Sequence, residues 1–284
     1  RRLQSVQRLV ELVVRRFERL DVLVHNAAQT IRRPPAWYEA LVRREEELGR
    51  LEDGEAEAES EAPGGSAGGS GGSEGFVNEA MALLPAALPG GLPLLSGDAE
   101  AEARKAEWFP PSQTDAHGEQ LDLRAATSWT QQIEDTEMPE LVEVLAVNLV
   151  VPYLLTAKLL PLLRKASYAF VVFVTSSEGS FTTPSGGKNS THPHTNAAKA
   201  GLNMLAKTIA GDLRRQSIFT SAVDPGWVSW MKPGGSQAVE GAPLTEADGA
   251  ARVLEPIVGG MRAIRANRCP PVGVLFKDFR VAPW

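Results

Sequence analysis

Short apolar runs separated by longer amphipathic stretches constrain this chain more than any other feature of its sequence. The first run, Val-Leu-Val at residues 22–24, is continuously apolar, as expected for a strand of a parallel sheet that is covered on both faces. Length and composition together predict strands at residues 21–25, 170–175, 219–223 and 272–276.

Apolar residues that recur three and four positions apart predict a helix beside each of these strands. The predicted helices cover residues 2–19, 139–165, 195–215 and 246–266. Thr245 and Asp248 have the spacing of a capping box at the start of the last helix. Helices that alternate with buried strands form right-handed crossovers, so the sequence predicts an α/β fold built on a parallel sheet.

Residues 33–125 interrupt this alternation. An acidic stretch with helical character at residues 43–61 is followed at residues 63–75 by Gly and Ser in a flexible-linker composition. We interpret residues 33–125 as a long insertion, disordered around residues 55–75, within a single α/β domain that spans residues 1–284.

The insertion leaves the domain after the strand at residues 21–25, on the side of the sheet where ligands bind. It is therefore a candidate lid or partner-binding flap. Its aromatic contact candidates are Trp37, Tyr38, Trp108 and Phe109. The alternative interpretation is a low-complexity expansion that the domain tolerates, since longer loops cost little additional closure entropy.

Charge and cysteine content exclude several classes of protein. A net charge of -6 gives no reason to expect a nucleic-acid partner. The single cysteine, Cys269, cannot form an internal disulfide, which indicates a reducing and most simply cytoplasmic compartment, with an organelle as the alternative. The richest apolar stretch, at residues 147–163, contains Asn148, Pro152 and Lys158, so we predict no membrane span.

Five motifs follow one another in order on the predicted elements. They are Leu-Asp-Val-Leu-Val-His-Asn-Ala-Ala at residues 20–28, Val-Asn-Leu around Asn148, Val-Thr-Ser-Ser at 174–177, His-Thr-Asn-Ala-Ala-Lys at 194–199, and Asp-Pro-Gly-Trp-Val at 224–228. Together they resemble the short-chain dehydrogenase/reductase family. The resemblance covers residues 1–32 and about 122–284. It is closest to a branch with His-Pro-His-Thr-Asn before the Lys and a Lys-Asp-aromatic tail ending in Trp.

The resemblance implies a Rossmann-like, doubly wound sheet, of which this chain holds the second half, strands 4 to 7 of the family. It also implies NAD or NADP as cofactor and a small carbonyl or alcohol as substrate. The cofactor-binding candidates are Asn26, Ala27 and Ala28 beside the adenosine, Lys199 on the ribose, and Pro225, Gly226 and Val228 beside the nicotinamide.

The resemblance implies catalytic roles as well. Ser177 aligns with the serine that hydrogen-bonds the substrate oxygen, and Ser176 is the alternative in a register shifted by one. Asn148 would support the proton relay to Lys199 through its backbone carbonyl and a water.

Thr195 stands where the family has its catalytic Tyr, four residues before Lys199. A phenol titrates near ~10 and is acidified by a neighbouring ammonium, whereas an aliphatic alcohol is too weak an acid for this role. His194 or His192 is a candidate substitute acid, because imidazole titrates near ~6.5. A metal site at this His pair is disfavoured, since no further ligands lie nearby in the sequence.

The second departure from the family is the lack of a Gly-rich turn for the cofactor phosphates after a first strand. We therefore expect a chain truncated at its N-terminal side, with the strand at residues 21–25 as a bare sheet edge.

Three hypotheses follow for function. The first is an NAD(P)-dependent oxidoreductase with a non-standard active site. The second is an inactive member of the fold that serves dinucleotide binding or subunit assembly, with homo-oligomers formed through the helices at residues 139–165 and 195–215. The third is a fragment without independent function. The choice between NAD and NADP stays open, because the residues that read the ribose 2′ position belong to the missing half.

Overall fold

The computed structural model describes residues 3–34, 95–110, 113, 121–181, 188–229, 231 and 242–284. The chain divides into two compact units, one formed by residues 1–32 and 105–284 and the other by residues 33–104. In the second unit the described helix is α4, Asp98–Ala103, where the Asp98 carboxylate accepts a hydrogen bond from the Leu95 N–H at 2.8 Å. The predicted helical stretch at residues 43–61, the linker at 63–75, and Trp37 and Tyr38 lie outside the described residues.

The first unit is built on a sheet with the strand order β1-β2-β3-β4-β5. The strands are β1 Val22–His25, β2 Ala169–Val174, β3 Ile218–Asp224, β4 Leu275–Lys277 and β5 Arg280–Ala282. β1 to β4 pair in parallel, which confirms the predicted α/β class, and β5 pairs antiparallel with β4. The β4–β5 turn at Asp278 and Phe279 has φ of 46° and 64°, the left-handed geometry of a tight hairpin that the sequence analysis missed.

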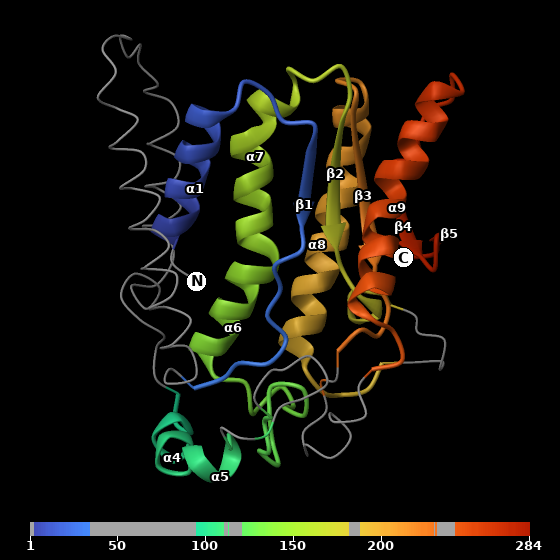
Figure 1. Cartoon of the computed structure of the whole chain (residues 1–284). Helices are drawn as coiled ribbons and strands as arrows, with labels where there is room; N and C mark the ends of the chain where they lie inside the picture. The colour runs from blue at the N-terminus through green and yellow to red at the C-terminus, as the bar shows by residue number, and fades with distance from the viewer. Residues whose placement is uncertain are drawn as a thin grey trace, which may run out of the picture. The chain divides into compact units, whose positions relative to one another are not determined.

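Helices cover both faces of this sheet (Figure 1). The elements in chain order are α1 Leu3–Arg16, α5 Lys105–Trp108, α6 Met138–Leu145, the π-turn η1 Ala146–Val150, α7 Val151–Leu163, the 3₁₀ turn η2 Ser177–Gly179, α8 Pro193–Arg214 and α9 Glu246–Arg265. The capping box predicted at Thr245 and Asp248 is present at the start of α9.

The core consists of two apolar clusters, one on each face of the sheet. Val171 and Phe173 of β2 pack with residues of α7 and α8, whereas Phe170 and Val172 pack with α9. Successive strand side chains point to opposite faces, so a continuously apolar strand is expected where both faces are covered.

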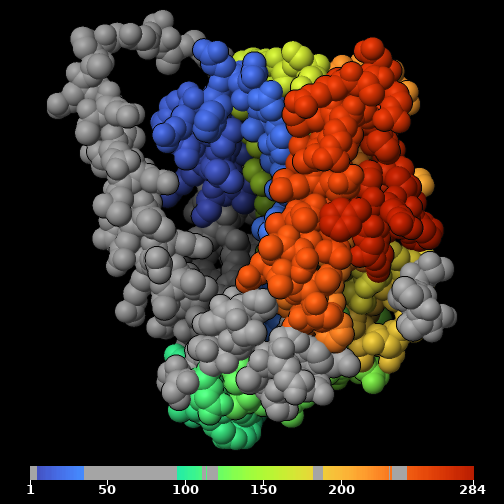
Figure 2. Space-filling model, turned by 45° about the vertical axis from the view of Figure 1, so that its right-hand side comes forward, coloured from blue at the N-terminus to red at the C-terminus, as the bar shows by residue number. Residues whose placement is uncertain are grey.

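β1 lies at one end of the described sheet, and Val22, Asn26, Ala27 and Ala28 on or just after it are exposed. Figure 2 shows α1 and α9 at the surface, in blue and orange. The apolar side chains of Leu9 in α1, Phe17 just after α1 and Leu254 in α9 are exposed.

The α6–η1–α7 segment runs as one helix over Met138–Leu163 and, by length and composition alone, is apolar enough to cross a membrane, with a hydropathy of 1.7. The helix was predicted over residues 139–165 and is present; Asn148, Pro152 and Lys158 interrupt its run of apolar residues but not the helix itself. The core helix of a soluble protein passes the same test, and Leu159, Leu162 and Leu163 here are buried in the packed core.

Candidate active site

The predicted site residues come from the carboxyl ends of the parallel strands, from the start of α8 and, for Asn148, from η1. Thr175 and Ser177 follow β2, Asp224 ends β3, and Thr195 and Lys199 lie in the first two turns of α8. This edge of a parallel sheet is where ligands bind in doubly wound folds.

Lys199 is the charged centre of this region. Its ammonium donates to the carbonyl oxygen of Val174 at 2.9 Å, and the residue is only 5% exposed. Burial lowers the pKa of Lys199 to about 8, and the neighbouring Asp224 carboxylate acts in the opposite direction. Asp224 accepts hydrogen bonds from the Gly226 N–H at 2.9 Å and forms an ion pair with Lys277 at 3.0 Å. Among the described residues the Val174 carbonyl is the one hydrogen-bond acceptor of this ammonium, which carries three hydrogens.

Asn148 fixes the loop after β1. Its side-chain amide donates to the Gln29 carbonyl at 2.7 Å, and its side-chain oxygen accepts from the Gln29 N–H at 2.9 Å. Asn148 is buried inside the π-turn η1, a local helix widening that is frequent at functional sites. The loop that follows Asn26 to Ala28 is therefore held to the α6–α7 segment by both backbone groups of one residue.

The turn after β2 packs tightly on α8. A Cβ atom on Gly179 would lie 2.8 Å from the backbone carbon and oxygen of Lys199, so only glycine fits without movement. Asn203 of α8 donates to the Gly179 carbonyl at 3.0 Å. Within the turn, the Ser176 hydroxyl accepts from the Glu178 N–H at 3.3 Å, and the Ser177 carbonyl accepts from the Lys188 ammonium at 2.8 Å.

Thr195 is 2% exposed, and its hydroxyl has no hydrogen-bond partner in the part of the chain that the structure describes. The Lys199 ammonium does not reach this hydroxyl, because it is directed to the carbonyl of Val174. The arrangement that acidifies a phenol in this fold is therefore not reproduced at Thr195.

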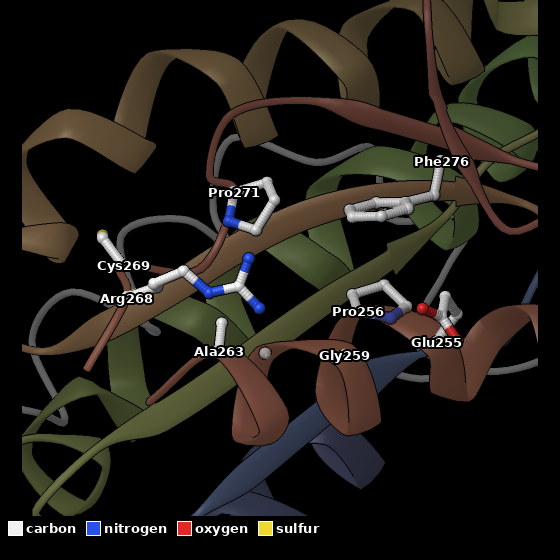
Figure 3. Close-up of a pocket in the computed structure, with 9 residues that line it drawn as sticks. Glu255, Pro256, Gly259, Ala263, Arg268, Cys269, Pro271 and Phe276 are labelled. Carbon is white, nitrogen blue, oxygen red and sulfur yellow. The ribbon is translucent and has the colours of Figure 1, made fainter. Parts of the chain in front are cut away.

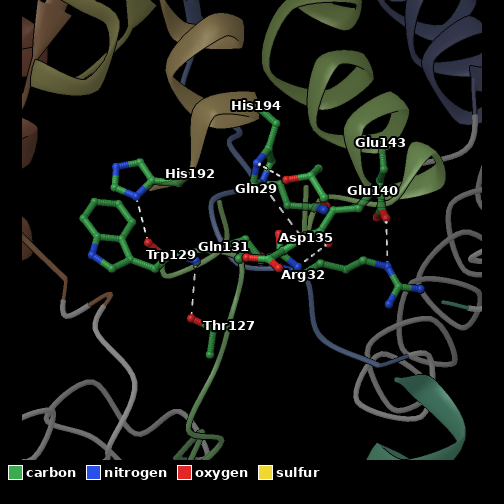
Figure 4. A network of polar contacts seen from close by, with 12 residues as sticks. Gln29, Arg32, Thr127, Trp129, Gln131, Asp135, Glu140, Glu143, His192 and His194 are labelled. Carbon is green, nitrogen blue, oxygen red and sulfur yellow. Dashed lines mark hydrogen bonds and ion pairs between the residues drawn. The ribbon is translucent and has the colours of Figure 1, made fainter. Parts of the chain in front are cut away.

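His194 turns away from the strand ends. Its Nδ1 lies 3.3 Å from the Thr136 hydroxyl, and its Nε2 lies 3.8 Å from a Glu140 carboxylate oxygen. Burial lowers the pKa of His194; Glu140 opposes this shift and His192 adds to it. Figure 4 shows the His192 and His194 rings directed to different parts of the polar network, His192 toward Trp129 and His194 toward Gln29 and Glu140.

The sequence analysis missed a buried acidic pair on α6. Glu140 and Glu143 are both buried, Glu140 accepts hydrogen bonds from Ser128 and from Gln131 at 3.0 Å, and Glu143 lies 3.5 Å from the Arg32 guanidinium (Figure 4). Two acidic residues three positions apart in an otherwise apolar helix were the available signal, but such residues more often lie on a solvated face.

The predicted cofactor residues occupy two environments. Asn26, Ala27 and Ala28 are exposed after β1, whereas Pro225, Gly226 and Val228 are half-buried after β3. Gly226 has φ of 84°, and a Cβ atom there would lie 2.6 Å from Leu244. Glycine is therefore required at position 226 of this turn.

These residues fit the nicotinamide-ribose side of a dinucleotide. A buried ammonium with hydrogens that have no acceptor among the described residues can bind ribose hydroxyls, and the glycine turn allows close approach of a planar ring. No Gly-rich phosphate turn of the family pattern occurs in the sequence. Among the described residues, no group of three or more His, Cys, Asp or Glu side chains is arranged to hold a metal ion.

A separate hollow of about 310 Å³ lies beside α9 (Figure 3). Its lining includes Glu255, Pro256, Arg268, Cys269 and Phe276. None of the predicted site residues lines it. The exposed Cys269 thiol donates to the neighbouring Pro270 carbonyl at 3.4 Å.

Comparisons with known proteins identify the family of this chain. The family model for short chain dehydrogenases matches residues 121–232. The chain is 30% identical to the C-signal protein of Myxococcus xanthus over 121 residues, which cover 43% of this chain and 70% of that protein. The chain belongs to the short-chain dehydrogenase family.

The chain spans about a third of the length of another curated relative. It is 32% identical over 166 residues to an uncharacterised protein of Acanthamoeba polyphaga mimivirus, covering 52% of this chain but only 34% of that protein. Among solved structures, the NADPH-bound carbonyl reductase from chicken fatty liver shares 22% identity, with a TM-score of 0.40, over 73% of this chain and 82% of that one.

Proposed function

We propose that this protein is an NAD(P)-dependent oxidoreductase that acts on a carbonyl or alcohol group through a non-standard active site. The observation that carries the proposal is the position of Lys199, a buried ammonium at the carboxyl ends of β2 and β3, where Val174 supplies its one acceptor among the described residues. Membership of the short-chain dehydrogenase family supports the same reaction class.

In this proposal NAD or NADP, when bound, supplies or accepts the hydride. Lys199 binds the ribose hydroxyls, and the half-buried turn at Pro225, Gly226 and Val228 lies against the nicotinamide. Asn26, Ala27 and Ala28 face the adenosine side. Asn148 keeps the loop after β1 in place through Gln29.

Ser177 orients the substrate oxygen. The Ser176 hydroxyl already accepts the Glu178 N–H and so caps the turn, which favours Ser177 over Ser176 for this role. We propose water, rather than Thr195 or His194, as the source of the proton. The Thr195 hydroxyl is too weak an acid, and a His194 ring with a lowered pKa is neutral at pH 7.

The test is binding and turnover by the purified chain. NADH and NADPH binding is followed by nicotinamide fluorescence, and oxidation is followed against a panel of aldehydes and ketones. Lys199→Ala is expected to abolish binding, whereas Lys207→Ala on the exposed side of the same helix is the matched control and is expected to bind normally. Equal binding by wild type and Lys199→Ala would refute the proposed role of the ammonium.

A second candidate function is dinucleotide binding without chemistry. The observation that favours it is the Thr195 hydroxyl, which has neither an activating partner nor an accessible surface among the described residues. Binding of NADH or NADPH by wild type with no turnover of any substrate would support this second function.

A further inference from the structure

His192 occupies an unusual position at the start of α8. It is the residue that precedes the helix, and its backbone has φ of 45°, in the left-handed region that L residues enter at a cost in free energy. Its N–H donates to the Gln131 carbonyl at 2.7 Å, and the residue is 1% exposed. A strained and fully buried polar residue requires compensating interactions.

Both ring nitrogens of His192 face acceptors. Nδ1 lies 2.8 Å from the Trp129 carbonyl oxygen, and Nε2 lies 3.0 Å from Oε2 of Glu178. A carbonyl oxygen and a carboxylate oxygen carry no hydrogen, so each contact is attractive only when the ring nitrogen brings one. The Thr191 hydroxyl, 2.9 Å from Nδ1, does not remove this requirement, because the Trp129 oxygen would still face a bare nitrogen.

Two further contacts favour a charged ring. The imidazole stacks on the Trp129 indole with ring centroids 4.0 Å apart and an interplanar angle of 14°, an arrangement that attracts a cation. The pKa of Glu178 is lowered, chiefly by its hydrogen bond with His192 and despite partial burial, with Lys188 contributing as well. Glu178 is thus ionised rather than the carrier of the shared proton.

The same carboxylate is tied to the turn that presents Ser177. Lys188 lies 3.3 Å from Oε2 of Glu178, and its ammonium also donates to the backbone carbonyls of Ser177 at 2.8 Å and Glu178 at 2.9 Å. We call Glu178, Lys188 and His192 the strand-end clamp. Two basic side chains share one carboxylate in it, and it joins the end of β2 to the start of α8.

We propose that His192 is a doubly protonated positioning residue, whose imidazolium bridges the Glu178 carboxylate and the Trp129 carbonyl and thereby holds Ser177 in place beside α8. The effect on catalysis rests on the proposed oxidoreductase function, whereas the charge state and the clamping do not. The titratable groups around the ring are Glu178, which contacts Nε2, Lys188, which contacts the same carboxylate, and His194; Glu140 lies 3.8 Å from the His194 ring.

The charge state is measured by NMR on the whole chain with ¹⁵N-labelled histidine rings. At pH 7 both ring nitrogens of His192 are expected to show imidazolium shifts, and Glu178→Gln is expected to convert the ring to a neutral form. His25 is the internal control, because burial lowers its pKa to about 4 and keeps it neutral. A neutral His192 ring in the wild-type protein would overturn the proposal.

The clamping is measured by hydrogen exchange of the amides at residues 175–180. Glu178→Gln removes the carboxylate charge that both His192 and Lys188 contact, and His192→Ala removes one of these two contacts. Each change is expected to speed this exchange roughly 10- to 100-fold. Arg164→Ala, which removes an exposed hydrogen bond to Gln216 remote from the clamp in sequence, is the control and leaves it unchanged. Unchanged exchange in both clamp variants refutes the positioning role.

The catalytic consequence is read from kinetics. Glu178→Gln is expected to lower kcat about 10-fold or more while the Kd for NADH or NADPH stays the same, because Lys199 and Gly226 are untouched. An equal kcat in wild type and Glu178→Gln would overturn the role in the reaction. A wild-type protein without turnover would instead refute the proposed oxidoreductase function, and the NMR and exchange results would still decide the clamp.

Discussion

Replacing Lys199 by methionine is expected to stabilise the protein at pH 7 while it destroys cofactor binding. Lys199 is almost fully buried and its pKa falls from the model-compound value of 10.5 to about 8, mainly through desolvation. A shift of this size corresponds to about 3 kcal/mol that the charged form costs in the folded state at neutral pH. Methionine has a similar volume and no charge, but it cannot donate the hydrogen bond to the Val174 carbonyl, which contributes about 1 kcal/mol. The net expectation is a gain of about 2 kcal/mol.

The sign of the pH dependence follows from the direction of the shift. The folded state releases the proton of Lys199 near pH 8, whereas the unfolded chain keeps it until about 10.5. The free energy of unfolding of the wild-type protein therefore rises by about 2 kcal/mol between pH 7 and pH 9.5 because of Lys199. The free energy of unfolding of Lys199→Met has no such contribution. The advantage of the variant is expected at pH 7 and should nearly vanish at pH 9.5.

The assay is urea unfolding of both proteins at the two pH values, followed by circular dichroism. Lys207→Met serves as the control, since Lys207 is exposed on the same helix, and its difference from wild type is expected to be independent of pH. A Lys199→Met protein that is less stable than wild type at pH 7, or a difference that does not change with pH, would refute the reasoning about the buried charge.

Three other substitutions have defined outcomes. Thr195→Val is expected to raise the unfolding free energy by about 1 kcal/mol in urea titrations, because it removes a buried hydroxyl without a partner among the described residues, and to leave turnover unchanged. Gly179→Ala is expected to cost about 2 kcal/mol or more, with unfolding midpoints as the measurement, since its Cβ would meet Lys199 backbone atoms at 2.8 Å. If α7 and α8 form a homo-oligomer interface, as we propose, Met204→Glu, at a side chain that is 59% exposed on α8, should shift the protein to a smaller species in sedimentation.

The elements of the sheet were predictable because each carries a local pattern. The Val-Leu-Val run of β1, the helical spacing of α1 and the capping box of α9 depend on neighbours in sequence, and all are present in the structure. The short β5 was not predictable in this way. Its strand is formed by three residues behind a turn of two left-handed residues that are not glycine, so neither length nor turn composition signalled it.

For the candidate site, the sequence predicted individual residues within short motifs but not the contacts between distant segments. Asn148, Ser177 and Lys199 were named from local sequence, but the partners that define their surroundings come from distant segments. Gln29 lies 119 residues from Asn148, and Trp129 lies 63 residues from His192. Helical periodicity also places Glu140 and Glu143 in water by default, whereas tertiary contacts bury them beside Ser128 and Arg32. These contacts join residues that are far apart in the sequence, so they depend on the tertiary arrangement of the strands and loops and not on any local pattern.

The energetic state of Lys199 bears on the choice between the two proposed functions. Methionine would stabilise the fold more than lysine at this position, because the buried charge costs about 3 kcal/mol and a neutral side chain avoids that cost. Thr195 differs from Lys199, because nothing in its surroundings indicates a role for its polar group. Its hydroxyl makes no hydrogen bond within the described chain, so valine can replace it. The group that we propose to bind a dinucleotide thus lowers the stability of the fold, while the hydroxyl at the position of the family's proton donor has no hydrogen-bond partner among the described residues. If turnover is absent, dinucleotide binding without chemistry accounts for both Lys199 and Thr195. If turnover is present, the proton comes from water beside Ser177. Substitution of Glu178 in the strand-end clamp is then expected to change the rate more than substitution of Thr195.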